Sequence, residues 1–299
     1  MINAAFFISL LILSQAATLI RFADASSLAI CFWRLAIAGA ILAPVAFGRT
    51  GRTELRRLVR SDVWHLALSG FLLFVHFYFF FRSVQETSIA NSTILFSLNP
   101  VTTALGAWLM FRERVTSHLV VACALGFVGI VVLFGEQWFD SSFQSTATSL
   151  HGNLWSIASA TCFSGYILTG KKLRLKLSNS TFASTIYLQT AVYASIAMLI
   201  VGDRFTEYTP ITWWMFVALA VFPTLLGHAV FTYCLNYLDV NFMSCMTLIE
   251  PIFAAIAAHY LFGEPMSHYA AVGFLFTCAS VVALYWPWIN SRFRARVRP

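Results

Sequence analysis

The sequence contains few charged residues. Only 10% of its 299 residues are Asp, Glu, Lys or Arg, whereas 59% are hydrophobic, and the mean hydropathy is +0.77. A soluble domain carries about 25% charged residues, so this chain lacks the side chains to build a polar surface around a core. A soluble globular fold is therefore excluded, and a lipid bilayer is the expected solvent.

The chain also lacks the short motifs that mark common enzymes and pumps. It contains no GxSxG, no HxxxH or HExxH, and no GxxxxGKS or GxxxxGKT loop. A serine hydrolase, a zinc site and a nucleotide-driven pump are therefore not expected. The aspartates lie only at the ends of apolar segments or in the links between them. We predict no enzymatic activity, no cofactor and no metal ion, with an intramembrane enzyme kept as an alternative.

The cysteines show no paired spacing of the kind that binds metal ions. All of them lie inside apolar segments, at Cys31, Cys123, Cys162, Cys234, Cys245 and Cys278. We expect them to pack as small apolar residues between helices and not to form a disulfide framework.

Long apolar runs are what the sequence has in abundance. Crossing about 30 Å of hydrocarbon takes roughly 20 apolar residues in a helix, and polar breaks divide the chain into ten such lengths. No basic residue precedes the first run, so we expect it to be retained and not cleaved as a signal peptide. The ten predicted spans are residues 2–22, 27–48, 62–83, 88–111, 116–135, 151–170, 180–202, 211–236, 240–262 and 267–287.

The Lys and Arg residues gather on one side of these spans. Fifteen of the 19 fall in the links on one side or at the C-terminus, three fall on the other side, and Arg34 lies inside a span. Basic links mark the cytoplasmic face, so we predict a multi-pass inner (plasma) membrane protein with both termini in the cytoplasm. Because the basic residues stand in short runs between apolar segments, the net charge of +7 indicates contact with the bilayer, and nucleic acid is not an expected partner.

One stretch of the sequence occurs twice. NPVTTALGAWLMFRERVT (99–116) aligns without a gap on EPIFAAIAAHYLFGEPMS (250–267), so that Pro100 matches Pro251. A proline in mid-span removes a backbone donor and bends the helix. We expect Pro100 and Pro251 to act as hinges or to shape the wall of a cavity.

The match predicts that the chain is a duplication of a five-helix unit. Residues 1–135 form the first unit, residues 151–287 form the second, and residues 288–299 form a basic cytoplasmic tail. Because five is odd, the second unit enters the membrane from the opposite side. The predicted fold is therefore an all-α membrane protein with ten transmembrane helices in two inverted-topology repeats. This arrangement is typical of transporters, whose halves exchange conformations around a central site.

Each unit contains a proline, then an Ala-rich apolar run, then Phe-x-Glu at Phe111 and Phe262. Two such copies in a ten-helix chain resemble the EamA-type drug/metabolite transporter superfamily, and in particular its bacterial amino acid and metabolite exporters. The resemblance covers nearly the whole chain. It implies two inverted five-helix repeats around a central cavity, and export of small metabolites from the cytoplasm.

Polar residues inside the spans are candidates for the substrate site, because a polar group in a bilayer usually faces a cavity or a partner. Asn99 and Glu250 are repeat equivalents, each directly before its proline, and we interpret their helix faces as two walls of one cavity. His76 and His228 lie in the equivalent third and eighth spans, where they either face a planar ligand or bond to a carbonyl. The predicted substrate-binding residues are Gln15, Arg34, His76, Phe80, Leu95, Asn99, Gln189, His228, Met246 and Glu250.

Two charged residues in the spans leave alternatives open. Glu250 either binds a substrate ammonium or carries a proton, or it pairs with Arg34 to lock helices together. Arg34 either attracts a substrate carboxylate, neutralises Glu250 or caps backbone carbonyls. The small four-helix relatives couple protons through an acid in their first helix, but neither 2–22 nor 151–170 contains Asp or Glu. Glu250 is then the substitute, or transport follows the substrate's own gradient.

The side chains of this site suit a zwitterion with an apolar side chain. We predict a monomeric exporter of amino acids, including aromatic ones, that works by alternating access. Nucleosides, other metabolites and cationic drugs are alternative substrates, and a channel is the alternative from another functional class.

Overall fold

The computed structural model describes residues 2–112, 116–139, 150–171, 173–234, 237–238, 246–265 and 267–297. Every regular element in these ranges is helical, and none of the residues in them forms a strand. The predicted all-α class is confirmed.

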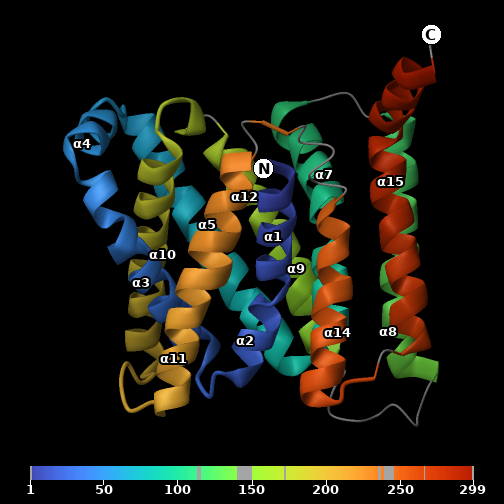
Figure 1. The fold of residues 1–299 in the computed structure, drawn as a ribbon, viewed down its shortest axis with the longest axis horizontal. Helices are drawn as coiled ribbons and strands as arrows, with labels where there is room; N and C mark the ends of the chain where they lie inside the picture. The colour runs from blue at the N-terminus through green and yellow to red at the C-terminus, as the bar shows by residue number, and fades with distance from the viewer. Residues whose placement is uncertain are drawn as a thin grey trace.

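The helices follow one another with short links (Figure 1). The first half contains α1 (Ile2–Ser14), α2 (Ala16–Phe22), α3 (Ser27–Ala46), α4 (Arg49–Arg56), α5 (Arg60–Glu86), α6 (Ile89–Phe96), α7 (Asn99–Phe111) and α8 (Ser117–Phe139). The second half contains α9 (Leu150–Gly170), the 3₁₀ turn η2 (Leu173–Leu175), α10 (Asn179–Val201), α11 (Pro210–Leu219), the π-helix η3 (Ala220–Ala229), α12 (Val230–Cys234), the 3₁₀ turn η4 (Thr247–Ile249), α14 (Glu250–Phe262) and α15 (His268–Val297).

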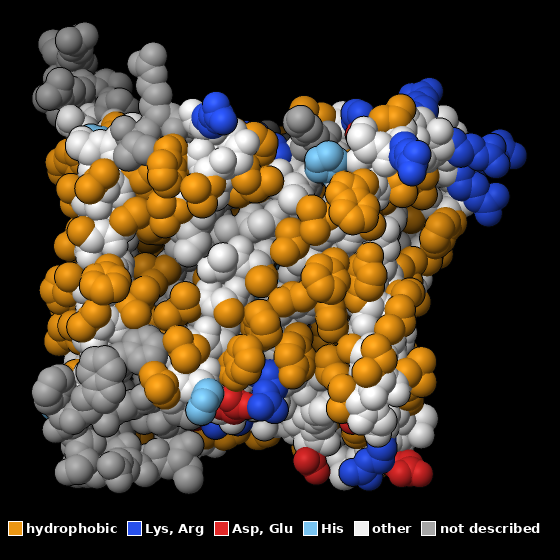
Figure 2. Space-filling view, turned by 180° about the vertical axis from the view of Figure 1, so that it is seen from behind, with side chains coloured by type: hydrophobic (Ala, Val, Ile, Leu, Met, Phe, Trp, Pro, Cys, Tyr) orange, Lys and Arg blue, Asp and Glu red, His pale blue; other side chains and the backbone are white. Residues whose placement is uncertain are grey.

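Much of this helical structure is suited to a membrane. Among the described residues, seven helical stretches are long and apolar enough to cross a bilayer, and Ser117–Leu133 and Thr247–Phe262 are shorter apolar helices. Large apolar side chains are exposed on the outer faces, including Ile200 at 80% and Leu275 at 66%. Figure 2 shows such side chains over the height of the molecule, with the larger groups of Lys and Arg at its upper end. The protein is therefore a multi-pass membrane protein.

Helices from the two halves of the chain pack against each other. α3 lies along α10, α5 along α9, and α8 along α15, while α1 packs on the π-helix η3. Both termini and α4 lie at the upper end of the molecule in Figure 1. Gly152 of α9 lies against the end of α5, where an added Cβ would lie 2.8 Å from the backbone of Glu86. Only glycine allows the helices to approach so closely there.

Two predicted spans are interrupted in mid-course. The predicted span 88–111 divides into α6 and α7 at Ser97 and Leu98, directly before Asn99 and Pro100. In the second half, the turn η4 precedes α14, which begins at Glu250 with Pro251 in its first turn. Pro lacks an amide hydrogen and fits the first turn of a helix, so each proline starts a new helix. Motion about these points remains a prediction.

The predicted span 211–236 is interrupted in another way. It begins as α11, continues as the π-helix η3 and returns to α-helix in α12. Pro223 lies inside the π-helix, where it has no amide hydrogen to donate to the carbonyl oxygen four residues earlier. Short π-helical segments are frequent at functional sites.

Candidate functional site

An aromatic cluster surrounds His76 of α5. Measured between ring centroids, His76 lies 5.3 Å from Phe96 of α6 and 4.9 Å from Phe163 of α9. Phe80 stacks on His76 at 6.2 Å and lies 5.4 Å from Phe96. His228 of the π-helix joins at 6.5 Å from Phe163. These five side chains, called the aromatic cluster below, bring together four separate elements.

Ser159 of α9 fixes the orientation of His76, which is only 4% exposed. Nδ1 of His76 lies 2.9 Å from the Ser159 hydroxyl and 3.2 Å from the Ser159 carbonyl oxygen. A carbonyl oxygen can only accept a hydrogen bond, so Nδ1 of His76 must carry the proton when it donates to the Ser159 carbonyl oxygen. In the neutral ring Nε2 is then an acceptor.

Arg34 of α3 is buried beside the aromatic cluster and is 2% exposed. Its Nε donates a hydrogen bond of 2.7 Å to the hydroxyl of Thr224 in the π-helix. Its guanidinium carbon lies 4.6 Å from the ring centroid of Phe77 and 5.6 Å from that of Phe81. Phe77 in turn lies 4.8 Å from His76 between ring centroids, so Arg34 and the aromatic cluster share one part of the interior.

Glu250 does not pair with Arg34. The ion pairs between described residues are Arg21–Glu264, Arg82–Glu86, Lys176–Asp62 and Arg204–Glu207. Glu250 is half-buried at the first position of α14, where the helix dipole favours a negative charge. The interpretation of Glu250 and Arg34 as a locking pair therefore has no support in this conformation.

Asn99 lies at the seam between α7 and α9. Its carbonyl oxygen accepts hydrogen bonds from the hydroxyls of Thr102 at 3.0 Å and Ser164 at 3.3 Å. Thr103 also donates to the Ser164 hydroxyl, at 2.9 Å. Small hydroxyl side chains thus satisfy the backbone at the start of the second half-helix.

Three further predicted residues pack in other places. Leu95 is fully buried in a small core that includes Ala255 of α14. Met246 packs against a core that contains Phe6 of α1. Gln15 lies between α1 and α2 and donates to the Ser14 hydroxyl at 3.0 Å. The aromatic cluster does not include these residues.

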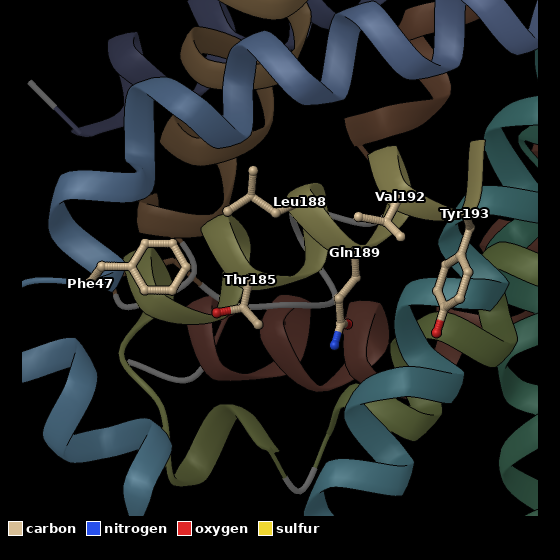
Figure 3. A pocket seen from close by; sticks show the side chains of 6 residues that line it. All are labelled: Phe47, Thr185, Leu188, Gln189, Val192 and Tyr193. Atoms are coloured by element: carbon tan, nitrogen blue, oxygen red, sulfur yellow. The ribbon is translucent and has the colours of Figure 1, made fainter. Parts of the chain in front are cut away.

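Gln189 lines a groove on the outer face of α10 (Figure 3). The groove has a volume of about 290 Å³ and is almost wholly apolar, and it is lined by Phe47, Thr185, Leu188, Gln189, Val192 and Tyr193. The amide oxygen of Gln189 is buried without a hydrogen-bond partner among the described residues, and it would lie 2.7 Å from a Cβ added to Gly70. Gln189 is therefore a helix-packing residue in this conformation, apart from the aromatic cluster.

Several residues of the site carry no signal in the sequence. Phe96 and Phe163 are two of 29 phenylalanines, and neither belongs to a motif. Ser159 is one of many small polar residues in the spans. Thr224 follows Pro223 directly, and this proline is the one local sign that could have pointed to it.

Polar contacts join the two halves of the chain at the lower end of the molecule. Arg21 of α2 forms an ion pair of 3.1 Å with Glu264 in the link after α14. Arg21 also donates to the carbonyl oxygen of Thr87 at 2.7 Å, and Glu264 accepts from the amide of Ile89 at 3.0 Å. These contacts, called the lower latch below, tie the link before α15 to the ends of α2 and α5.

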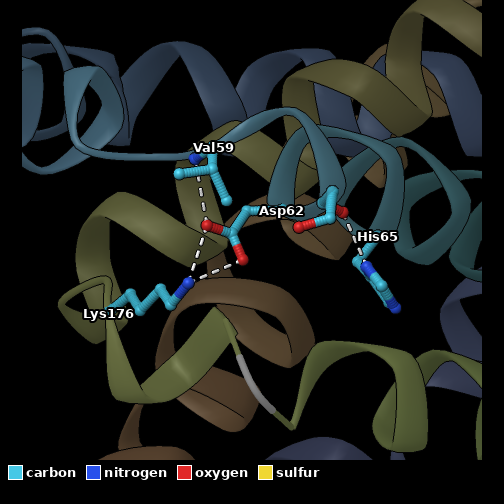
Figure 4. Close-up of polar contacts among 5 residues, drawn as sticks. Val59, Asp62, His65 and Lys176 are labelled. Carbon is cyan, nitrogen blue, oxygen red and sulfur yellow. Dashed lines mark hydrogen bonds and ion pairs between the residues drawn. The ribbon is translucent and has the colours of Figure 1, made fainter.

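A second set of contacts lies at the upper end. Figure 4 shows Lys176 and the amide of Val59 converging on the carboxylate of Asp62. The closest Lys176–Asp62 distance is 2.7 Å. His65 turns instead towards the carbonyl oxygen of Ser61, at 2.6 Å. Asp62 therefore connects the start of α5 to the segment before α10.

Comparison with known proteins decides the family. The model of the EamA-like transporter family matches residues 1–135 and 150–286. The chain belongs to the EamA-like transporter family. Its architecture also matches a solved crystal structure with a TM-score of 0.65 over 95% of this chain and 96% of the other, at 18% sequence identity.

Relatives of this EamA-like protein are transporters. An uncharacterized transporter of Archaeoglobus fulgidus is 24% identical, over 84% of this chain and 85% of the relative. The uncharacterized transporter YxxF of Bacillus subtilis is 22% identical, over 78% and 73%. An S-adenosylmethionine/S-adenosylhomocysteine transporter of Chlamydia trachomatis is 25% identical, over 81% and 76%. The EamA-like protein is therefore a membrane transporter for a small molecule.

Proposed function

We propose that this EamA-like protein is a secondary transporter that exports amino acid-like metabolites from the cytoplasm by alternating access. The observation that carries the proposal is the interruption of a helix before Pro100 and again before Pro251. Transporters with inverted repeats build central sites at such interruptions. The two interruptions also place Asn99 and Glu250 at the starts of half-helices.

The packing of the helices supports ten spans in two inverted repeats. In the predicted order, α3 and α10 are the second and seventh spans, and α8 and α15 are the fifth and tenth. In a five-plus-five duplication, the two helices of each pair occupy equivalent positions in the two repeats. The helices of both pairs pack along each other. The contact of α5 with α9 likewise has its counterpart in the contact of η3 with α1. The two matches to the family model, 1–135 and 150–286, agree with the predicted units to within one residue at each boundary.

The charge distribution supports an orientation in the membrane, and the family resemblance supports export. The end of the molecule that holds both termini also carries the larger groups of Lys and Arg, and the positive-inside rule assigns that end to the cytoplasm. We therefore propose an inner-membrane location, cytoplasmic termini and export. The protein is proposed to act as a monomer.

The proposed substrate is an amino acid with an apolar or aromatic side chain. Arg34 supplies a positive charge beside the flat apolar surface of the aromatic cluster, and we propose that Glu250, at the start of α14, supplies the negative charge. The relative that carries S-adenosylmethionine supports a second candidate, since this molecule combines an amino acid group with a planar base. The rings of the aromatic cluster can pack against an aromatic side chain or against a planar base.

Counterflow in proteoliposomes tests the proposal. Vesicles containing the purified protein are loaded with unlabelled L-phenylalanine, L-alanine, S-adenosylmethionine or adenosine, and uptake of the labelled compound is measured. We expect saturable uptake with L-phenylalanine that vesicles without protein do not show. Uptake only with S-adenosylmethionine or adenosine would favour the second candidate. Uptake that does not saturate and needs no internal substrate would indicate a channel.

A further inference from the structure

Only one nitrogen of the Arg34 guanidinium group donates a hydrogen bond within the described parts of the chain. Its Nε is held by the Thr224 hydroxyl, and its faces lie over Phe77 and Phe81. The two terminal nitrogens, Nη1 and Nη2, donate no hydrogen bond to any residue in the described parts of the chain. A guanidinium has five N–H donors in a rigid fork, so the edge formed by Nη1 and Nη2 is available.

The orientation of Arg34 follows from the proline in the π-helix. Pro223 has no amide hydrogen, which leaves the carbonyl oxygen of Leu219 without its α-helical donor. The Thr224 hydroxyl donates to this oxygen at 2.8 Å. Because its proton is used there, the same hydroxyl can only accept from Arg34. The chain Leu219–Thr224–Arg34 therefore fixes the Nε side of the guanidinium and does not involve Nη1 or Nη2.

The charge of Arg34 has no carboxylate partner. It takes part in no ion pair among the described residues, and its guanidinium lies over the uncharged rings of Phe77 and Phe81. An unpaired cation inside a bilayer is energetically unfavourable. Cation–π contacts with two phenylalanines offset part of this, and a bound anion would offset the remainder.

We propose that the Nη1–Nη2 edge of Arg34 binds an oxyanion, such as a carboxylate, on the transported molecule, and that Thr224 positions the guanidinium group of Arg34. A carboxylate accepts two parallel hydrogen bonds from this edge. The aromatic cluster takes the apolar part of the same molecule. The inference rests on the proposed transport function and narrows its substrates, since it favours carboxylates and disfavours cationic drugs without an anionic group.

Ligand-induced thermal stabilisation of the full-length protein in detergent tests this anion site independently of transport. The probes are 3-phenylpropanoate, its neutral amide, and phenyl phosphate. We expect 3-phenylpropanoate to raise the Tm of the wild type and to bind at least tenfold more tightly than the amide, because hydrogen bonds to a charged group are lost with the amide. Phenyl phosphate separates carboxylate selectivity from general oxyanion binding. Equal stabilisation by acid and amide, or none by either anion, overturns the proposal.

Variants at Arg34 and Thr224 test whether these two residues form the binding site for 3-phenylpropanoate. Arg34→Lys keeps the charge but loses the fork, and we expect it to weaken binding of 3-phenylpropanoate by about tenfold while the amide is unaffected. Thr224→Val keeps the shape but loses the hydroxyl and should also weaken binding of the acid, whereas Thr224→Ser should restore it. Unchanged acid binding in both Arg34→Lys and Thr224→Val overturns the proposal. If acid binding depends on Arg34 while no amino acid shows counterflow, the anion site stands and amino acid export fails.

Discussion

Arg34 and Glu250 carry opposite charges inside the membrane-spanning part of the chain, and neither takes part in the ion pairs formed by the described residues. Removing one partner of a buried pair typically costs about 3–5 kcal/mol, because the other charge is left uncompensated. The structure shows no such pair, so a substitution at one of the two residues breaks no ion pair with the other. Substitution at Glu250 can therefore report on its own role without the loss of a structural partner.

Glu250→Gln tests whether this residue carries a proton. We expect the Tm in detergent to change by less than about 2 °C, because no pair is broken. Counterflow of substrate should continue, whereas accumulation driven by an imposed pH gradient should disappear. Glu207→Gln, at an exposed position in the link after α10, is the matched control and should behave as wild type. A response to the pH gradient that survives in Glu250→Gln would exclude Glu250 as the proton carrier.

The candidate site could be predicted from the sequence only in part. Arg34, His76 and His228 stand out because charge and imidazole are rare in apolar segments, and the structure brings them together with Phe80. Phe163 could not be found, because its role depends on how α5 packs on α9, and a phenylalanine in a span is otherwise unremarkable. The polarity of Gln189 makes it a candidate in the sequence, but Gly70 on the neighbouring helix gives it room to act in packing.

Whole elements could be predicted better than their interruptions. The apolar runs and their links follow from the periodic absence of charge, and the repeat shows that Pro100 and Pro251 are equivalent. The π-helix was not predicted, although Pro223 lies within it. A proline in an apolar run can bend, break or widen a helix, and the outcome depends on which group takes the freed carbonyl. Here Thr224 takes it, and only the folded structure shows this.

α4 is joined to the start of α10 by a carboxylate, which makes their contact sensitive to pH. Glu54 accepts hydrogen bonds from the amide and the hydroxyl of Ser178, at 2.9 and 3.0 Å. Burial raises the pKa of Glu54, but these hydrogen bonds, another from Thr181 and the charge of Arg57 together hold it below its ordinary value. Because the pKa is lower in the folded state, the stabilisation is present above the unfolded pKa and is lost as the pH falls through the folded one.

Thermal unfolding at pH 6.5 and at a pH of about 3.5 tests this contact. We expect the Tm of the wild type to fall more between the two conditions than that of Glu54→Gln, since the amide cannot be protonated in this range. Glu207→Gln again serves as the control, because its carboxylate is exposed and makes only a 4.0 Å contact with Arg204. Equal falls in Tm for the wild type and Glu54→Gln would show that the contact between Glu54 and Ser178 does not contribute to the pH dependence of stability.

At the scale of the whole molecule, ion pairs connect the two halves of the chain at both ends. The lower latch joins Arg21 to Glu264, and Asp62 is joined to Lys176 at the upper end. Alternating access requires one end to separate while the other stays closed. A carrier of this kind is therefore expected to break one of these sets of contacts in each conformation, and their relative strengths bias the population of the two states.

Arg21→Gln tests whether the lower latch holds that end closed. The variant loses the ion pair with Glu264 and weakens the bond to the Thr87 carbonyl, which together amount to about 1 kcal/mol for a partly exposed pair. A cysteine introduced at Phe96, in the aromatic cluster, should then react with a membrane-impermeant thiol reagent from the predicted external side roughly fivefold faster, in a background without the native cysteines. Arg204→Gln removes an exposed arginine with a weak 4.0 Å contact and should leave the rate unchanged. If Arg21→Gln also leaves it unchanged while remaining folded, the lower latch does not control access, and closure of that end depends on the packing of α2, α5 and α14.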